Sequence, residues 1–320
     1  MQFPQTENHL REIRASDINE LASTELGKNR RYLQLQPGSL NCDLTEVKLE
    51  GALLVRERLS TGVQIEAAPP DNFFPLGTVL SPSEGMRFCG NEFKKNTLIQ
   101  ATGGEWSLNF KGSLEYVGCV LSKEFLTQGA ELLTGRAVPP EWFVSRVRLT
   151  DPSALNCYRH WIAKTIFQLE NEPGLMANPD IRRLLSAKIL QLTLNVLNST
   201  EEFKAKLMPP TRRLRGVRRV IDYLKAHASY LPTIPELCAV ALLSERSLEY
   251  GFREQLGVTP VRYLKLVRLN GARGELLAAE PGVMKVVDVA LSWGFLELGR
   301  FSGEYFRLFK ELPSVTLRRG

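Results

Sequence analysis

Between Arg31 and about Leu121, short apolar runs alternate with clusters of Gly, Pro, Asn and Asp. These runs have the length of strands, and none of them has helical spacing. The clearest runs are 32–36, 52–55, 63–65, 97–101, 106–110 and 116–121. Strand-length runs separated by turn signals are typical of an antiparallel barrel or sandwich, so this part of the chain is predicted to be rich in β-structure. Before it, one short helix is expected near Asp17–Leu21.

From about Lys123 the hydrophobic period becomes helical, and helices are predicted over 124–133, 152–169 and 179–197. The last of them carries an apolar stripe at helical spacing: Ile181, Leu184, Leu185, Ile189, Leu192 and Val196. Such a stripe either packs against the strands or pairs with a second subunit, and packing within the chain is favoured. A linker is then expected over Ser199–Thr211, which contains Pro209-Pro210.

The last third of the chain contains two helix-turn-helix patterns in tandem. An amphipathic helix over 212–226 precedes the first pattern, Thr233–Gly257, and a connecting helix over 261–277 leads to the second, Val286–Phe306. In the first pattern Thr233 is a cap, three residues before Glu236, and Ser244 caps the second helix. This geometry presents the second helix of each pair to the major groove of DNA.

Helical spacing separates core positions from outward positions in the two second helices. Leu248 and Phe252 are expected in the core, as are Phe301, Tyr305 and Leu308. The residues left to face DNA are Ser244, Arg246, Ser247, Glu249, Tyr250 and Arg253 in the first helix, and Gly299, Arg300, Ser302, Gly303 and Glu304 in the second. Arginine suits the O6 and N7 atoms of guanine, and glutamate accepts from N4 of cytosine.

The charge is divided unevenly along the chain. Residues 211–320 hold 18 Lys and Arg against 11 Asp and Glu, a net of +7, whereas residues 1–210 hold 23 against 24, a net of −1. A basic module attached to a neutral one is what binding to phosphates requires electrostatically. The excess coincides with the helix-turn-helix patterns, which makes double-stranded DNA the expected partner.

Several classes of function are excluded by what the sequence lacks. A metal-dependent enzyme on a β-barrel needs clustered histidines, whereas the chain has only His9, His160 and His227. No nucleophile elbow, phosphate-binding loop or dinucleotide fingerprint occurs, so no catalytic residue, metal or cofactor is expected. The five scattered cysteines indicate reduced thiols. Without a signal peptide or a long apolar run, the protein is expected in the cytoplasm and not at a membrane.

About 105 residues of this region resemble the AraC/XylS family of transcription regulators. The resemblance rests on Glu236-Leu237, Ser244-x-Arg246-x-Leu248, Phe252, Gly257-x-Thr259-Pro260, Tyr263-Leu264, Arg268-Leu269, Ala272-Arg273, Asp288-x-Ala290, Gly294-Phe295, Phe301, Phe309 and Pro313-Ser314. Within the family, segments 294–301 and 313–317 are similar to the branch that contains the ethanolamine-operon regulator. The resemblance implies a cupin-like amino-terminal domain for effector sensing or dimerisation.

The chain departs from the family pattern at three places. Tyr250 and Gly303 occupy positions where the family often carries a basic residue, and Leu242-Leu243 replaces a turn that often contains glycine. We therefore expect fewer direct contacts to bases than is usual, with more weight on Arg246, Arg300 and the shape of the DNA.

Together these observations predict an α+β protein. Residues 1–210 are expected to form a β-rich, cupin-like sensing and dimerisation domain with a helical extension, and residues 211–320 an all-α domain with two helix-turn-helix motifs. The predicted function is a dimeric transcription activator that contacts RNA polymerase and is controlled by an unknown small effector. Control by a protein partner is the alternative. Candidate effector-binding side chains are Trp106, Phe88, Phe110, Tyr116 and five arginines, Arg30, Arg31, Arg56, Arg58 and Arg87.

Overall fold

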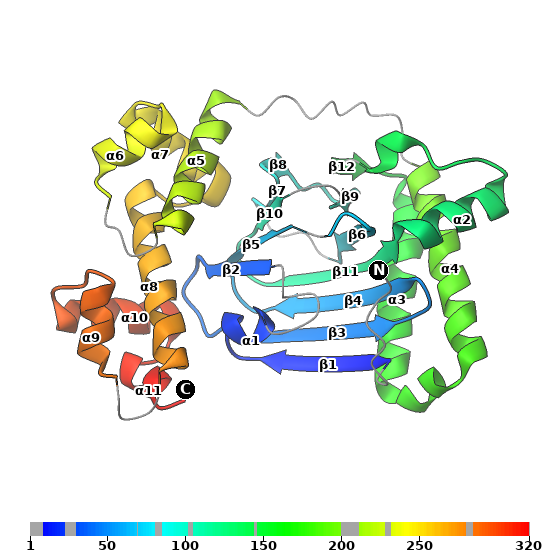
Figure 1. Cartoon of the computed structure of the whole chain (residues 1–320), viewed down its shortest axis with the longest axis horizontal. Helices are drawn as coiled ribbons and strands as arrows, with labels where there is room; N and C mark the ends of the chain where they lie inside the picture. Colours follow the sequence, from blue (N-terminus) through cyan, green and yellow to red (C-terminus); the bar gives the residue numbers. More distant parts are fainter. Residues whose placement is uncertain are drawn as a thin grey trace.

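The computed structural model describes residues 9–22, 30–68, 70–80, 85–101, 105–143, 146–199, 211–227, 232–279 and 284–319. Two β-sheets occupy the middle of the molecule (Figure 1). One group of helices, α2–α4, covers one end of them, and a second group, α5–α11, lies at the opposite end. Of the predicted linker, Ser199–Thr211, residues 200–210 lie outside the described residues.

Every strand pairing in the described residues is antiparallel, as the sequence predicts. In spatial order, the seven-stranded sheet contains β1 (Leu10–Ala15), β3 (Cys42–Lys48), β4 (Ala52–Leu59), β11 (Leu114–Ser122), β6 (Phe73–Val79), β9 (Thr97–Gln100) and β12 (Arg146–Leu149). The five-stranded sheet contains β2 (Arg30–Gln34), β5 (Val63–Ala67), β10 (Trp106–Asn109), β7 (Arg87–Phe88) and β8 (Asn91–Glu92). All six predicted strands are present, and a short helix, α1 (Ile18–Ala22), lies where one was expected.

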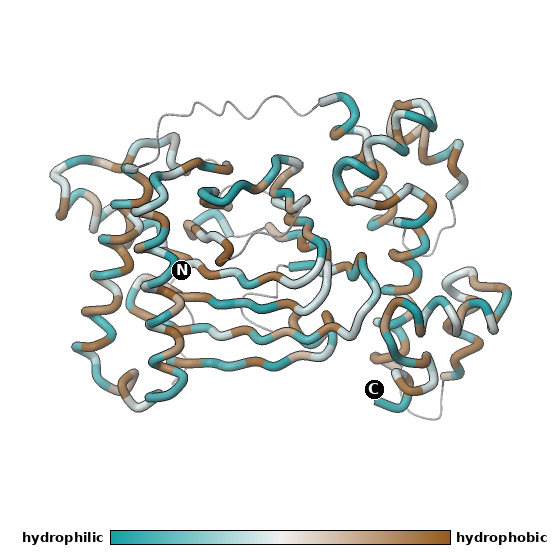
Figure 2. The backbone as a smooth tube through the Cα atoms, turned by 180° about the vertical axis from the view of Figure 1, so that it is seen from behind, coloured by the Kyte–Doolittle hydropathy of each residue, from teal (hydrophilic) through white to brown (hydrophobic). Residues whose placement is uncertain are grey.

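Two apolar cores hold the amino-terminal domain together. One fills the space between the sheets and includes the fully buried rings of Phe88 and Phe110. The other lies between the seven-stranded sheet and the helices α2 (Lys123–Thr134), α3 (Pro152–Asn171) and α4 (Pro179–Asn198). Figure 2 shows hydrophilic and hydrophobic positions following one another along strands and helices, as half-buried elements require. Two short 3₁₀ helices, Pro140–Phe143 and Pro173–Ala177, complete the domain.

The apolar stripe of α4 is divided between core and surface. Ile189, Leu192 and Val196 are buried in the core against the sheet, so the prediction of packing within the chain is confirmed for them. Leu184 of α4 is 69% exposed, and Phe167 of α3 is 60% exposed. Whether a second subunit covers them stays a prediction, and so does the assignment of the sheets to a cupin-like barrel.

The carboxy-terminal domain is all-α in its described residues. Its helices are α5 (Arg212–Ala226), α6 (Ile234–Ala241), α7 (Glu245–Leu256), α8 (Pro260–Ala278), α9 (Val286–Ser292), α10 (Leu298–Phe309) and α11 (Pro313–Leu317). They share one core, in which the predicted residues Leu248, Phe252, Phe301, Tyr305 and Leu308 are all buried. The α+β prediction is therefore confirmed, with β-sheets and helices first and the helix-turn-helix domain after them.

The described residues contain neither a membrane-spanning helix nor a group of side chains placed to hold a metal ion. None of their helices has both the length and the apolar character needed to cross a bilayer. The five cysteines are free, and burial raises the pKa of the Cys119 thiol to about 11. Within the described ranges no group of three or more His, Cys, Asp or Glu side chains is placed to hold a metal ion.

Candidate nucleic-acid interface

The first motif is set by two hydrogen-bonded caps. Thr233 Oγ1 accepts from the backbone N–H of Glu236, while the Glu236 carboxylate accepts from the backbone N–H of Thr233, so a capping box starts α6. Ser244 then accepts from the backbone N–H of Ser247 and starts α7, which ends at Gly257 in a left-handed conformation. Both caps agree with the sequence prediction.

The turn between α6 and α7 carries backbone strain. Leu242 has a φ of +54°, in the left-handed region that glycine adopts without steric cost. Its side chain is 61% exposed, so little burial compensates for this conformation. The replacement of a turn glycine, visible in the sequence, therefore has a structural consequence.

We expect Leu242→Gly to raise the free energy of unfolding by about 1 kcal/mol, because the strain disappears and little apolar contact is lost. Leu243→Gly is the matched control, since Leu243 is half-buried against the domain core and its loss should be destabilising. Thermal or urea denaturation measures both variants. A loss of stability in Leu242→Gly would show that Leu242 contributes packing that outweighs the strain.

The outward face of α7 is polar and partly preorganised. Arg246, Tyr250 and Arg253 are exposed, whereas Ser247 and Glu249 are half-buried. The guanidinium of Arg246 lies 5.7 Å from the centre of the Tyr250 ring, and that of Arg213 on α5 lies 6.0 Å from it. Tyr250, which replaces a basic residue of the family pattern, thus has two arginines at its ring.

The second motif is held by contacts from the connecting helix α8. Arg268 donates from Nε to the carbonyl of Trp293 at 2.7 Å and covers the Phe295 ring at 4.4 Å, which fixes the turn between α9 and α10. Lys265 pairs with Glu304 of α10 at 2.8 Å. In this structure the partners of both side chains lie within the protein.

The outward face of α10 contains the predicted residues and two more that the sequence pattern did not single out. Gly299, Arg300 and Gly303 are exposed, and Ser302 is half-buried. Phe306, 48% exposed, and Arg307 continue this face by one turn. Their spacing of three and four residues from Gly303 was the available signal, since such positions share a helix face. Arg307 is therefore added as a candidate phosphate contact.

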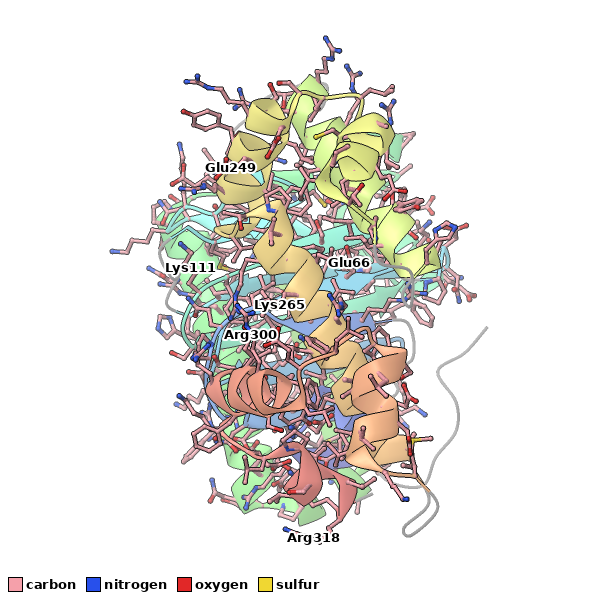
Figure 3. The ribbon with its side chains drawn as sticks, turned by 90° about the vertical axis from the view of Figure 1, so that its left-hand side faces the viewer. Glu66, Lys111, Glu249, Lys265, Arg300 and Arg318 are labelled. Carbon is pink, nitrogen blue, oxygen red and sulfur yellow. The ribbon has the colours of Figure 1, made fainter. Side chains whose placement is uncertain are left out.

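The two outward faces lie on the same side of the molecule. Figure 3 shows Glu249 on α7, Lys265 on α8 and Arg300 on α10 along one face of the carboxy-terminal domain, with the sheets behind it. The exposed ion pairs on this face, Arg253 with Glu249 at 2.8 Å and Arg300 with Glu297 at 4.0 Å, are weak and can exchange for DNA contacts. One rigid helix thus presents two polar helix faces to a common partner.

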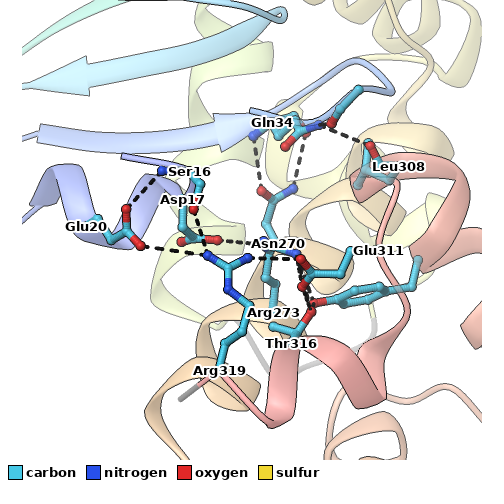
Figure 4. Close-up of polar contacts among 12 residues, drawn as sticks. Ser16, Asp17, Glu20, Gln34, Asn270, Arg273, Leu308, Glu311, Thr316 and Arg319 are labelled. Atoms are coloured by element: carbon cyan, nitrogen blue, oxygen red, sulfur yellow. Dashed lines mark hydrogen bonds and ion pairs between the residues drawn. The ribbon is translucent and has the colours of Figure 1, made fainter. Parts of the chain in front are cut away.

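The opposite side of α8 is bound to the amino-terminal domain (Figure 4). The Asn270 side chain accepts from the backbone N–H of Gln34 at 3.1 Å and donates to its carbonyl at 3.2 Å, at the end of β2. The Gln34 side chain in turn donates to the carbonyl of Leu308 at 3.1 Å. Tyr263 donates to Gln64 Oε1 at 2.9 Å. These contacts fix α8 and the last turn of α10 while leaving the outward faces of α7 and α10 open.

A buried ion-pair network strengthens this docking. Arg273 donates from Nε to Asp17 at 2.5 Å, and its Nη1 lies 3.4 Å from Glu311. Burial acts against the charge of Arg273, but Tyr305 and Asp17 outweigh it and hold the pKa above its ordinary value. Burial also raises the pKa of Tyr305 to about 12, so the hydroxyl stays protonated and donates to Thr316 at 2.8 Å.

The candidate effector-binding side chains of the amino-terminal domain are dispersed. Phe88 and Phe110 are core residues, Tyr116 is half-buried, and Trp106 lies at the face turned toward α5. Four of the five arginines bond to the protein: Arg30 to Glu57, Arg56 to Glu170, Arg58 to Glu115 and Arg87 to the carbonyl of Gly90. Arg31 is exposed, and the guanidinium that lies over the Trp106 ring, at 5.6 Å, is that of Arg30. They do not form one anion site.

Comparison with known proteins agrees with this geometry. A family model described as a helix-turn-helix domain matches residues 237–319. The probable thc operon regulatory protein of Rhodococcus erythropolis is 37% identical over 152 residues, 47% of this chain and 45% of that protein. The XylDLEGF operon transcriptional activator 2 of Pseudomonas putida is 35% identical over 99 residues, 31% of this chain and 63% of that protein. The matches span less than two thirds of either relative.

Among solved structures, the AraC-like transcriptional activator CuxR aligns with 83% of this chain and 96% of its own, at 13% identity and a TM-score of 0.40. Neither operon regulator is named for an ethanolamine operon. The helix-turn-helix match and the two operon regulators agree with the motif anchors found in the sequence. The carboxy-terminal domain thus matches a helix-turn-helix family over residues 237–319, and it is similar to the corresponding part of transcription regulators of the AraC/XylS type.

Proposed function

We propose that this protein is a sequence-specific transcription activator that reads two successive major-groove segments with α7 and α10. The observation that carries the proposal is the placement of both helices, with exposed polar faces, on one side of the molecule and at the two ends of α8. Two such faces on one rigid connector can contact two groove segments one helical turn apart. The relatives named as operon activators support the direction of regulation.

The proposed base and backbone contacts are the residues of the two outward faces. Arg246 and Arg300 would bind guanine, and Glu249 would accept from cytosine. The contact made by α7 would be completed by Ser244, Ser247, Tyr250 and Arg253. The contact made by α10 would be completed by Gly299, Ser302 and Gly303. Because Gly303 offers no side chain and Tyr250 no charge, part of the specificity is assigned to DNA shape.

The amino-terminal domain, residues 1–210, is proposed to sense a small effector and to dimerise, while residues 211–320 bind DNA. Exposed Leu184 and Phe167 support a subunit contact on the helices remote from the DNA-binding face. We propose RNA polymerase as the second partner and the cytoplasm as the compartment in which the protein acts. The proposed subgroup is the branch that contains the ethanolamine-operon regulator. A protein partner in place of the effector is the alternative. Thermal-shift screening separates the two, because a bound ligand raises the melting temperature.

In-vitro selection from random duplex DNA at about 150 mM salt tests the proposal with the full-length chain. Enrichment of a site with two elements about 10 bp apart is the expected result. If the full-length chain binds DNA in a salt-sensitive way but the selection enriches no sequence, the proposal of sequence-specific binding is contradicted.

We expect Gly303→Ala to stabilise the protein and weaken its DNA binding. No atom lies within 4 Å of a Cβ placed on Gly303, so alanine fits and should add about 0.5–1 kcal/mol of helix stability. On the selected DNA site the added methyl would obstruct a close approach of the backbone and reduce affinity. Gly174→Ala, also unobstructed but remote from α10, is the control. Equal affinity for Gly303→Ala and wild type would show that no such approach occurs.

A further inference from the structure

Lys111 of the amino-terminal domain lies against the end of α7. It belongs to the turn that joins β10 to β11, and Gln36 holds this turn because its Oε1 atom accepts from the backbone N–H of Gly112 at 2.6 Å. A Cβ placed on Gly257, the residue that ends α7, would lie 2.7 Å from Cε of Lys111. The lysine side chain therefore passes directly over this glycine, and one domain places a cation at the end of a proposed DNA-reading helix of the other.

The ammonium group of Lys111 is exposed and has no acidic partner in the described part of the chain. Two carboxylates of α7 already have cationic partners. Glu249 pairs with Arg253 at 2.8 Å. Glu254 pairs with Arg213 of α5 at 3.2 Å. The carbonyl groups at the end of an exposed helix attract a cation only weakly, so the charge of Lys111 is available to an anion outside the chain.

Lys111 lies on the side of the molecule that carries the outward faces of α7 and α10. Figure 3 shows it at a level between Glu249 of α7 and Arg300 of α10, and its contact with Gly257 places it directly beside the carboxy-terminal domain. Arg262, on the first turn of α8, is a second cation without an ion pair in the described ranges. Basic groups from both domains thus lie between the two proposed reading helices.

The sugar-phosphate backbone of DNA must pass this level if α7 and α10 occupy two successive segments of the major groove. On one side of a B-form duplex, two such segments are separated by the minor groove and by the two backbones that border it. DNA carries one negative charge per about 1.7 Å of its axis. A cation that lies between the two helices therefore meets phosphates, whatever the base sequence.

We propose that Lys111 binds a phosphate of the DNA backbone, so that the amino-terminal domain contributes directly to the DNA interface. This rests on the proposed function, because it takes the DNA to lie across α7 and α10. The contact exists only while the two domains are docked, with Gln34 of β2 bound to Asn270 of α8. An event in the amino-terminal domain that loosens this docking removes a phosphate contact and lowers the affinity for DNA of any sequence.

The test is the salt dependence of DNA affinity, measured by fluorescence anisotropy on the full-length chain with the selected duplex and with one unrelated duplex. For Lys111→Ala we expect the slope of log K against log salt concentration to be smaller in magnitude by about 0.9, the contribution of one phosphate contact, and the affinity to be several-fold lower for both duplexes. Lys111→Arg should keep the wild-type slope. Lys164→Ala is the matched control, since it removes the same charge from an exposed position on α3, at the opposite end of the molecule.

A slope that is unchanged in Lys111→Ala, or reduced equally in Lys164→Ala, overturns the phosphate contact. A lower affinity with an unchanged slope also overturns it, since Lys111 would then act only by positioning α7. The proposed function fails separately, if Arg246 and Arg300 can both be replaced without loss of affinity. In that case a reduced slope for Lys111→Ala keeps the phosphate contact and places the DNA away from α7 and α10. If the full-length chain binds neither duplex, both proposals are rejected.

Discussion

Replacement of Arg273 by leucine is expected to lower the free energy of unfolding by about 3–5 kcal/mol, the range for removal of one partner from a buried ion pair. The side chains of Arg273 and Asp17 are only 7% and 1% exposed. Without the guanidinium, the buried Asp17 carboxylate between α1 and α8 loses the ion pair with Arg273, and Glu311 loses one cationic partner. Urea denaturation of the full-length chain measures the effect.

A double-mutant cycle shows whether this loss comes from the ion pair. Asp17→Leu combined with Arg273→Leu removes both charges, and we expect it to recover most of the stability that the single variant loses. Arg319→Leu is the matched control, because Arg319 is 36% exposed and pairs with the same Glu311 at 2.9 Å. An exposed pair contributes at most about 1 kcal/mol. A loss for Arg273→Leu no larger than that of the control would mean that the domains do not depend on this network.

The helices of the DNA-binding domain could be predicted because their signals are local. Thr233 and Glu236 are three residues apart and form the capping box within one turn. The strands β3 and β6 were missed for a physical reason. In β3, Thr45 and Glu46 are buried although they are polar, and β6 contains Pro75 and Gly77, which ordinarily argue against a strand. Gly77 is required there because the Tyr116 ring lies where its Cβ would be.

The contacts between the domains could not be predicted from local pattern. Asn270 and Gln34 are 236 positions apart, and Arg273 and Asp17 are 256 apart. The only signal was that Asn270 and Arg273 share a helix face with Leu266 and Leu269, since polar groups on an apolar stripe need partners when they are buried. Which residues of the sheet domain supply those partners depends on the docking of the two domains.

The second large effect is expected on DNA binding, in the variant that combines Arg246→Ala with Arg300→Ala. Each arginine is exposed and is proposed to bind guanine, so each substitution should cost about 1–3 kcal/mol and relax the preference for one base pair. They lie on different helices at the two ends of α8, so the losses should add to about 2–6 kcal/mol. That corresponds to an affinity lower by a factor of about 30 to 2 × 10⁴ on the selected site.

Arg183→Ala is the control for this variant, because Arg183 is an exposed arginine on α4, at the opposite end of the molecule. Fluorescence anisotropy with the selected duplex and with one unrelated duplex measures affinity and specificity together. If the double variant loses affinity equally for both duplexes, the arginines contact phosphates and sequence is read elsewhere, because phosphate contacts carry no sequence information. If it keeps wild-type affinity for the selected site, α7 and α10 do not bind DNA through these residues, and the shared face of the two helices has another partner.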